Sequence, residues 1–260
     1  MERPEVTATG RANSPDISDG TGTSAVRKDR PKAGPLPPSP CPRCGKIVEV
    51  KRSTKLSCPH CMASLHVLVN PETKERQLLD DEGEKKLNAR KAELHVINTG
   101  ARLFRQYGID KVAIEAEYAK LRKDGRPWTY ADAVWSLSNR LVLENIGDLH
   151  LLKMIYYGQA IFLESQGKDP SPLIRLSNDM DLQMERKRFR EVKISAVGGC
   201  EACRSSHGKV FSIEEALETH PIPNPGCTYR FEEGHPPFCR CRYQPVLDSM
   251  ISRLDRDGTR

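Results

Sequence analysis

Two short cysteine motifs decide how the first ordered part of this chain folds: CPRCG at residues 41–45 and CPHC at residues 58–61. In each motif two residues separate the cysteines, so both thiolates reach one metal ion from a tight backbone turn. Gly45 permits the sharp turn that follows the first pair. Four thiolates complete the tetrahedral shell that structural zinc prefers. The spacing therefore predicts a structural Zn²⁺ site whose ligands are Cys41, Cys44, Cys58 and Cys61.

The residues around these motifs favour short strands. Apolar and polar residues alternate over residues 46–51, and residues 65–69 are rich in β-branched and apolar side chains. Two cysteine knuckles joined by short strands resemble a zinc ribbon, here over residues 41–70. So small a unit needs its metal to fold, and binding supplies on the order of 10 kcal/mol. His60 and His66 are further ligand types, although four cysteines already fill the shell.

The first forty residues are rich in proline and glycine. Residues 1–40 hold seven prolines and four glycines but no aromatic side chain. The segment PKAGPLPPSP at residues 31–40 favours an extended, polyproline-like backbone. So little apolar surface cannot offset the entropy lost when the chain orders. We predict a disordered tail over residues 1–40 that ends where the first knuckle begins.

Helical patterns dominate the middle of the chain and predict a helical domain over residues 82–190. Apolar residues recur there at steps of three and four. Thr129 and Asp132 resemble a capping box, and Asp148 follows a glycine as a further cap. The predicted helices cover residues 84–107, 110–123, 129–141, 149–166 and 171–190. Five helices with short connections favour a bundle, and we find no catalytic constellation among them.

A second group of cysteines predicts a Cys-rich zinc-binding module over residues 191–247. Its candidate ligands are Cys200, Cys203, Cys227, Cys239, Cys241 and His235. Cys200 and Cys203 form a knuckle, and two of the later cysteines complete a tetrahedral site. We favour Cys227 and Cys239 in these positions, with Cys241 or His235 as replacements.

Short strands and one helix frame this second group. Residues 191–197 alternate as a strand, residues 208–211 favour another, and Ser212 is typical of a residue that opens a helix. The fold class expected for the whole chain is therefore mainly α, with small zinc-stabilised β and α+β modules. Both zinc ions are expected to be structural, because protein ligands close each shell.

The C-terminal pattern also resembles a known family. After the knuckle come HGKVF at residues 207–211 and HPPFCRC at residues 235–241. This order is similar to the C-terminal motif of Mu F-like phage head morphogenesis (minor capsid) proteins. The resemblance covers residues 192–245 and implies a metal group of Cys200, Cys203, His235 and one of Cys239 or Cys241. The chain departs from the pattern by one extra residue before Cys239, by Cys227 and by the preceding ribbon.

Composition and charge exclude some classes of protein. The apolar runs are too short for a transmembrane helix, and the first residues, MERPEVTATG, lack the pattern of a secretory signal. We therefore expect a cytoplasmic protein without membrane partners, in which paired cysteines indicate metal rather than disulfides. Lysine and arginine outnumber acidic residues by 41 to 35, a net charge of +6. Five of these basic residues lie in residues 41–70 against Glu49 alone, which fits a nucleic-acid or other polyanionic partner.

Three functions follow as hypotheses. The first, which we favour, is a non-enzymatic zinc protein that binds nucleic acid or a protein partner through its ribbon and basic helices. The second is a phage or prophage-derived head morphogenesis protein with partners in a capsid-type assembly. The third is an enzyme, either with a nuclease-like zinc module or with a thiol of Cys227 or Cys241 as nucleophile. In the thiol enzyme, His207, His220 or His235 would be the base.

Overall fold

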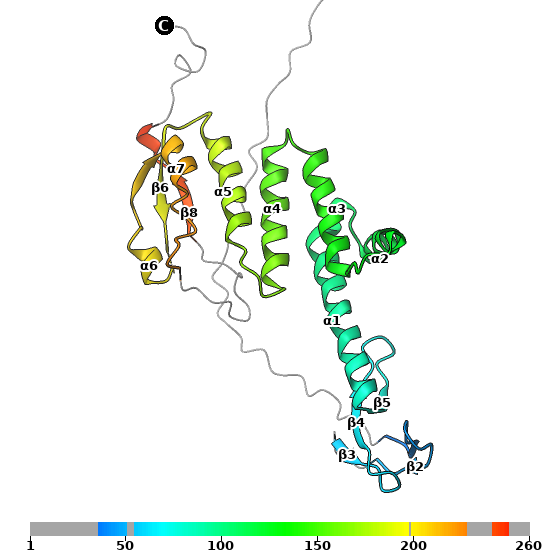
Figure 1. The fold of residues 1–260 in the computed structure, drawn as a ribbon. Coiled ribbons are helices and arrows are strands. Elements are labelled where there is room, and N and C mark those ends of the chain that lie inside the picture. Colours follow the sequence, from blue (N-terminus) through cyan, green and yellow to red (C-terminus); the bar gives the residue numbers. More distant parts are fainter. Residues whose placement is uncertain (1–35, 51–54, 198, 228–240, 250–260) are drawn as a thin grey trace, which may run out of the picture.

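The computed structural model describes residues 36–50, 55–197, 199–227 and 241–249. Helices and small antiparallel sheets dominate these residues, as the sequence predicts (Figure 1). The ribbon lies at one end of a long first helix, and the last sheet lies beside the fifth helix. The predicted tail falls outside the described residues except for its last five.

The ribbon contains more strands than the sequence predicts. Strands β1 (Ser39–Pro40) and β2 (Ile47–Val48) pair across the first knuckle. Strands β3 (Lys55–Ser57), β4 (Ser64–Val69) and β5 (Arg76–Asp80) form an antiparallel sheet in the order β3-β4-β5. The sheet therefore continues beyond residue 70, where the predicted ribbon ends, and β1 uses the last two residues of the predicted tail.

Five α-helices follow and contact one another in sequence order. They are α1 (Asp81–Phe104), α2 (Lys111–Leu121), α3 (Tyr130–Glu144), α4 (Leu149–Glu164) and α5 (Ser171–Glu185). Figure 1 shows α5, α4 and α3 side by side in that order, with α1 next to α3 and α2 seen nearly end-on at the outer side of α3. The 24-residue α1 is about 36 Å long at 1.5 Å per residue, and β4 and β5 pack on its first turns.

Local capping signals place the starts of α2, α3 and α4 where the sequence predicts them. Asp110 and Asp148 accept hydrogen bonds from the first-turn amides of α2 and α4. Thr129 and Asp132 form the complete capping box that opens α3. Gly108 takes the left-handed conformation, with φ of 82°, that ends the helical turn after α1.

Helix α5 begins at Ser171, as predicted, but ends earlier than predicted. It ends at Glu185 rather than near Arg190, because the chain turns there and places Phe189 in an apolar core with Leu182. Its N-cap is Pro170, and the amide of Ser171, the first residue of the helix, donates to the Asp169 carboxylate.

The helical core depends on one close approach between α1 and α3. Ile97, Phe104, Ile114 and Val134 are buried in the same cluster. A Cβ atom placed on Gly100 of α1 would lie 2.6 Å from a methyl group of Val134, so only glycine lets the two helices approach this closely.

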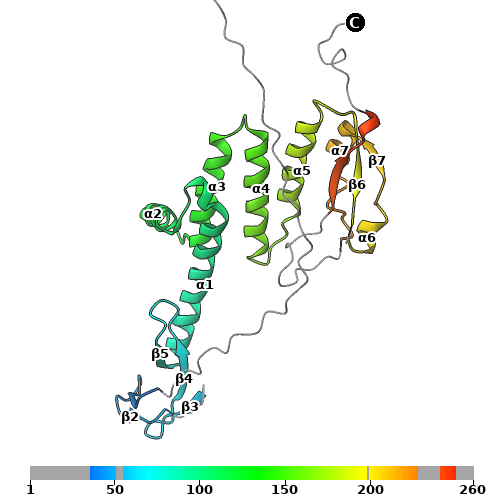
Figure 2. The ribbon, with the colours of Figure 1, turned by 180° about the vertical axis from the view of Figure 1, so that it is seen from behind.

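The C-terminal module is a small α+β unit that packs on α5 (Figure 2). Strand β6 (Glu191–Ser195) is the centre of a sheet with β7 (Val210–Ser212) and β8 (Arg242–Pro245), both antiparallel to it. The short helices α6 (Glu201–Arg204) and α7 (Ile213–Thr219) follow β6 and β7, and Ser212 caps α7 as predicted.

Candidate metal centres

The two knuckles of the ribbon have the same backbone geometry. The Gly45 amide donates to the Cys41 carbonyl, and the Met62 amide donates to the Cys58 carbonyl, both at 2.9 Å. Gly45 has φ of 73°, as the sharp turn predicted for it requires. Met62 holds the equivalent position with φ of 59°, a left-handed backbone conformation that residues other than glycine rarely adopt. The second turn thus holds Met62 in a strained backbone conformation, as is common where a functional site fixes the backbone.

The four ribbon sulfurs meet at separations that suit one metal ion. The Sγ atoms of Cys41 and Cys61 are 3.8 Å apart, and those of Cys44 and Cys58 are 3.7 Å apart. A tetrahedral shell with metal–sulfur bonds of about 2.3 Å has edges of about 3.8 Å, whereas a disulfide bond is only about 2.05 Å long. All four sulfurs lie within 4.8 Å of one another. The cluster is therefore positioned for a metal with four thiolate ligands.

The knuckles favour ionisation of one ribbon sulfur and oppose that of another. Burial opposes ionisation of Cys58, but the backbone amides of His60 and Cys61 and the neighbouring thiols lower its pKa to about 6. The Ala63 amide lowers the pKa of Cys61, yet burial and hydrogen bonds with the three other cysteines outweigh it and raise this pKa to about 12. Four adjacent thiols cannot all ionise unless a cation balances them. A divalent metal bound among the four sulfurs supplies that charge.

Three cysteines of the C-terminal module form a second cluster. Cys200 is the N-cap of α6, Cys203 is buried within that helix, and Cys227 arrives from the loop after α7. Their sulfurs lie within 4.8 Å of one another, and those of Cys200 and Cys227 are 3.8 Å apart. This spacing again suits a thiolate-bound metal, and the structure brings together three of the ligands that the sequence proposes.

The structure places one further candidate ligand beside this cluster. Cys241, just before β8, packs against the small core that contains Cys203 and Ile194. The favoured Cys239 and its replacement His235 lie outside the described residues. Among the described residues, Cys241 is therefore the cysteine positioned to complete a set of four.

Asn224 holds the Cys227 loop on α6, a role that the sequence analysis missed. Its side-chain amide donates to the Ala202 carbonyl at 3.0 Å and to the Ser206 hydroxyl at 3.3 Å. Its side-chain oxygen accepts from the Gly226 amide at 2.8 Å. The bond from Gly226 forms an Asx turn, and the bonds to Ala202 and Ser206 attach the loop that carries Cys227 to α6 and the turn after it. An asparagine three residues before a cysteine was the only sequence signal for it.

A third group of metal-ligand types, around His66, acts as a clamp between the ribbon and α1. The buried His66 ring faces Asp81 through Nε2 at 2.7 Å and Glu84 through Nδ1 at 3.2 Å. The His66 hydrogen bond lowers the pKa of the Asp81 carboxyl. Both ring nitrogens already face carboxylates, so charge-assisted hydrogen bonds account for the group without a metal. His60, the other ribbon histidine, is exposed.

The histidines considered as bases for an enzyme have structural partners where they are described. Nδ1 of His207 accepts a hydrogen bond from the Ala196 amide at 3.1 Å. Nδ1 of His220 pairs with Asp179 at 3.1 Å, although burial still raises the pKa of that carboxyl. Cys227, one of the two nucleophiles considered, belongs to the metal cluster. These positions favour structural over catalytic roles.

Comparisons of the chain with known protein families, with curated proteins and with solved structures found no match. Among the helices that the structure describes, none is long and apolar enough to cross a membrane.

Proposed function

We propose that the chain is a non-enzymatic zinc protein that binds nucleic acid, with one structural Zn²⁺ in the ribbon and one in the C-terminal module. The observation that carries this proposal is the closed set of four ribbon sulfurs at tetrahedral spacing. A shell filled by four protein ligands leaves no position for water or substrate, so such a metal stabilises structure rather than chemistry. Cys241 is the proposed fourth ligand of the second site.

The charge on the ribbon supports a polyanionic partner. Arg43 and Lys46 are exposed on the first knuckle, while Val48 and Cys41 form the core beneath them. A metal-fixed turn holds these cations at set positions, which suits contact with the regularly spaced phosphates of a nucleic acid. The thiolate sites also suit a reducing compartment such as the cytoplasm.

Native mass spectrometry of the intact protein, purified without chelator, tests the metal assignment. We expect two zinc ions per chain, one of which is lost when Cys41 and Cys44 are replaced by serine. The matched pair Cys200→Ser/Cys203→Ser removes the other ion and leaves the ribbon loaded. A wild-type chain without bound zinc would overturn the proposal.

Titration of a labelled oligonucleotide at several salt concentrations tests the binding role. Arg43→Glu/Lys46→Glu should weaken binding and flatten its salt dependence by about one unit of slope per lost phosphate contact. The control Lys168→Glu/Lys193→Glu changes the net charge equally at two exposed lysines outside the ribbon. Higher-order assemblies with no affinity for the oligonucleotide would instead support the capsid-type role that the C-terminal resemblance implies.

A further inference from the structure

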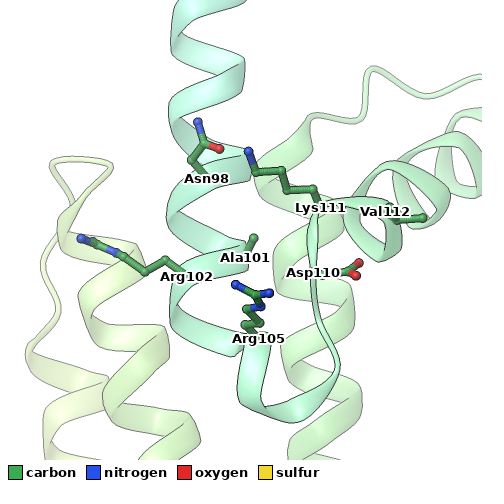
Figure 3. A pocket seen from close by; sticks show the side chains of 7 residues that line it. All are labelled: Asn98, Ala101, Arg102, Arg105, Asp110, Lys111 and Val112. Atoms are coloured by element: carbon green, nitrogen blue, oxygen red, sulfur yellow. The ribbon is translucent and has the colours of Figure 1, made fainter. Parts of the chain in front are cut away.

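An open cleft of about 630 Å³ lies between the end of α1 and the start of α2 (Figure 3). Its volume falls within the range of roughly 300–1,000 Å³ typical of ligand sites. The lining residues come from the last two turns of α1, the turn after it and the first residues of α2: Asn98, Ala101, Arg102, Arg105, Asp110, Lys111 and Val112.

Three cations and one carboxylate line this cleft. Within the part of the chain that the structure describes, Arg102, Arg105 and Lys111 form no ion pair, unlike Arg90, which pairs with two glutamates. Asp110 is the one carboxylate in the lining, and its Oδ1 already caps the Ala113 amide at 2.9 Å. The N-terminus of α2 is thus occupied by its own cap, so the side chains provide the positive field.

The lining side chains combine cations, one carboxylate, an amide and an apolar group. Figure 3 shows Arg105 below the start of α2 and Lys111 extending toward α1, while Arg102 points to the other side of α1. Val112 exposes 71% of its surface on α2, where its side chain points away from Lys111, and Asn98 adds an amide near the end of Lys111. Cations, an amide and an exposed valine in one lining suit a ligand that combines a phosphate with a sugar or base.

We propose that this cleft binds a phosphate group of a nucleic-acid strand, which rests on the function proposed above and names a second contact site for it. The guanidinium fork of Arg105 and the ammonium of Lys111 contact the phosphate oxygens. Arg102 extends the contact on the other side of α1, and Val112 covers a sugar or base of the same strand. An acidic peptide offers carboxylates but no flat apolar group beside each charge.

The test compares binding of a labelled single-stranded oligonucleotide by the full zinc-loaded chain and by Arg105→Glu/Lys111→Glu. We expect affinity to fall at least tenfold and the salt slope to flatten by about two, one for each lost contact. Both residues are exposed, and glutamate in the first turn of α2 favours that helix, so the variant should fold. Circular dichroism checks this, and Lys111→Gln, with a flattening of about one, is the milder second variant.

The controls separate the cleft from general charge and from other anions. Lys168→Glu/Lys193→Glu makes the same change in net charge and should alter affinity less than threefold, and polyglutamate and inorganic tripolyphosphate serve as competitors. Equal weakening in this control, or unchanged binding by the cleft variant, overturns the cleft site and leaves the proposed function standing. Polyglutamate competing as well as unlabelled oligonucleotide overturns the phosphate specificity. A wild-type chain that binds tripolyphosphate but no oligonucleotide overturns both proposals.

Discussion

Removing the ribbon metal should unfold the ribbon and leave the helical bundle intact. The perturbation is Cys41→Ser/Cys44→Ser, which deletes half of the sulfur shell. Besides two cysteines, the buried cluster of the ribbon contains Val48, Ala63 and Leu65 among the described residues. The bundle core draws its buried residues from 97–162 and shares none of them with the ribbon. Loss of the ribbon metal should therefore unfold the ribbon alone.

The size of the effect follows from the structure. The two knuckles, residues 41–46 and 58–63, contain six residues each, and ordering those backbones costs about 12–24 kcal/mol at about 1–2 kcal/mol per residue. Burying one valine, one leucine and one alanine returns about 4–7 kcal/mol. The remaining deficit of about 5–20 kcal/mol spans the roughly 10–16 kcal/mol that structural zinc supplies. Without the metal the knuckles have no net stability.

Hydrogen exchange measured by mass spectrometry on the intact chain checks this expectation. In the variant, amides of β4 and β5 should lose their protection, while those of α3 and α4 keep it. The first turn of α1 should also exchange faster, because it is clamped to the ribbon through His66. Met62→Asn is the control, since it changes an exposed side chain of the second knuckle to a residue that tolerates the left-handed backbone. Unchanged β4 protection in a variant that has lost its zinc would refute the reasoning.

Three further perturbations test other parts of the structure. Glu117→Gln should lower the free energy of unfolding by about 1–3 kcal/mol, because the buried Glu117 carboxylate accepts from Ser136 and Arg140. Burial opposes ionisation of Glu117, but these partners hold its pKa below the ordinary 4.5. The stabilisation from the carboxylate is therefore complete above pH 4.5 and is lost as the pH falls through the pKa of the folded protein. Urea unfolding of both proteins from pH 7 to pH 3 measures the difference. Gly100→Ala should lower the free energy of unfolding by about 1–2 kcal/mol, because the strain of the new contact with Val134 exceeds the gain of about 1 kcal/mol in helix propensity. In a Val134→Ala background the substitution should cost nothing, and thermal melts of the double-mutant cycle measure both effects. Asn224→Ala should weaken zinc binding at the second site about tenfold in a chelator competition, with the ribbon site as internal reference.

The parts of the fold that could be predicted from the sequence are those specified by residues close together in the chain. The helix caps at Asp110, Thr129 and Asp148 use side chains within three residues of the amides they satisfy, so the sequence displays them directly. Strand β5 has no such signal, because RQLLD at residues 76–80 becomes a strand only by pairing with β4. The early end of α5 is equally non-local, since it depends on Phe189 reaching a core built from other elements.

The two cysteine clusters differ for the same reason. The four ribbon ligands could be proposed from the sequence because each knuckle is a local turn with its own pair of sulfurs. In the second cluster only Cys200 and Cys203 are local to each other, and Cys227 reaches them through the Asn224 turn. The position of Cys241 beside them depends on how β8 pairs with β6, which no spacing rule predicts.

The contrast between the two ends of α1 separates charges that hold the fold from charges available to a partner. At its start, Asp80 caps Gly83, Asp81 and Glu84 face His66, and Glu82 pairs with Lys86, so each carboxylate there has a partner. At its end, Arg102 and Arg105, with Lys111 of the same cleft, are exposed and form no ion pair within the described part of the chain. A helix N-terminus favours acidic residues and its C-terminus basic ones, so the dipole alone explains the signs. It does not explain why Lys111, at the start of the next helix, adds a cation where the dipole of α2 disfavours one. Lys111 therefore lies where the dipole of its own helix is unfavourable, in a cleft with two arginines that form no ion pair among the described residues. An anionic ligand explains this position better than the stability of the fold does.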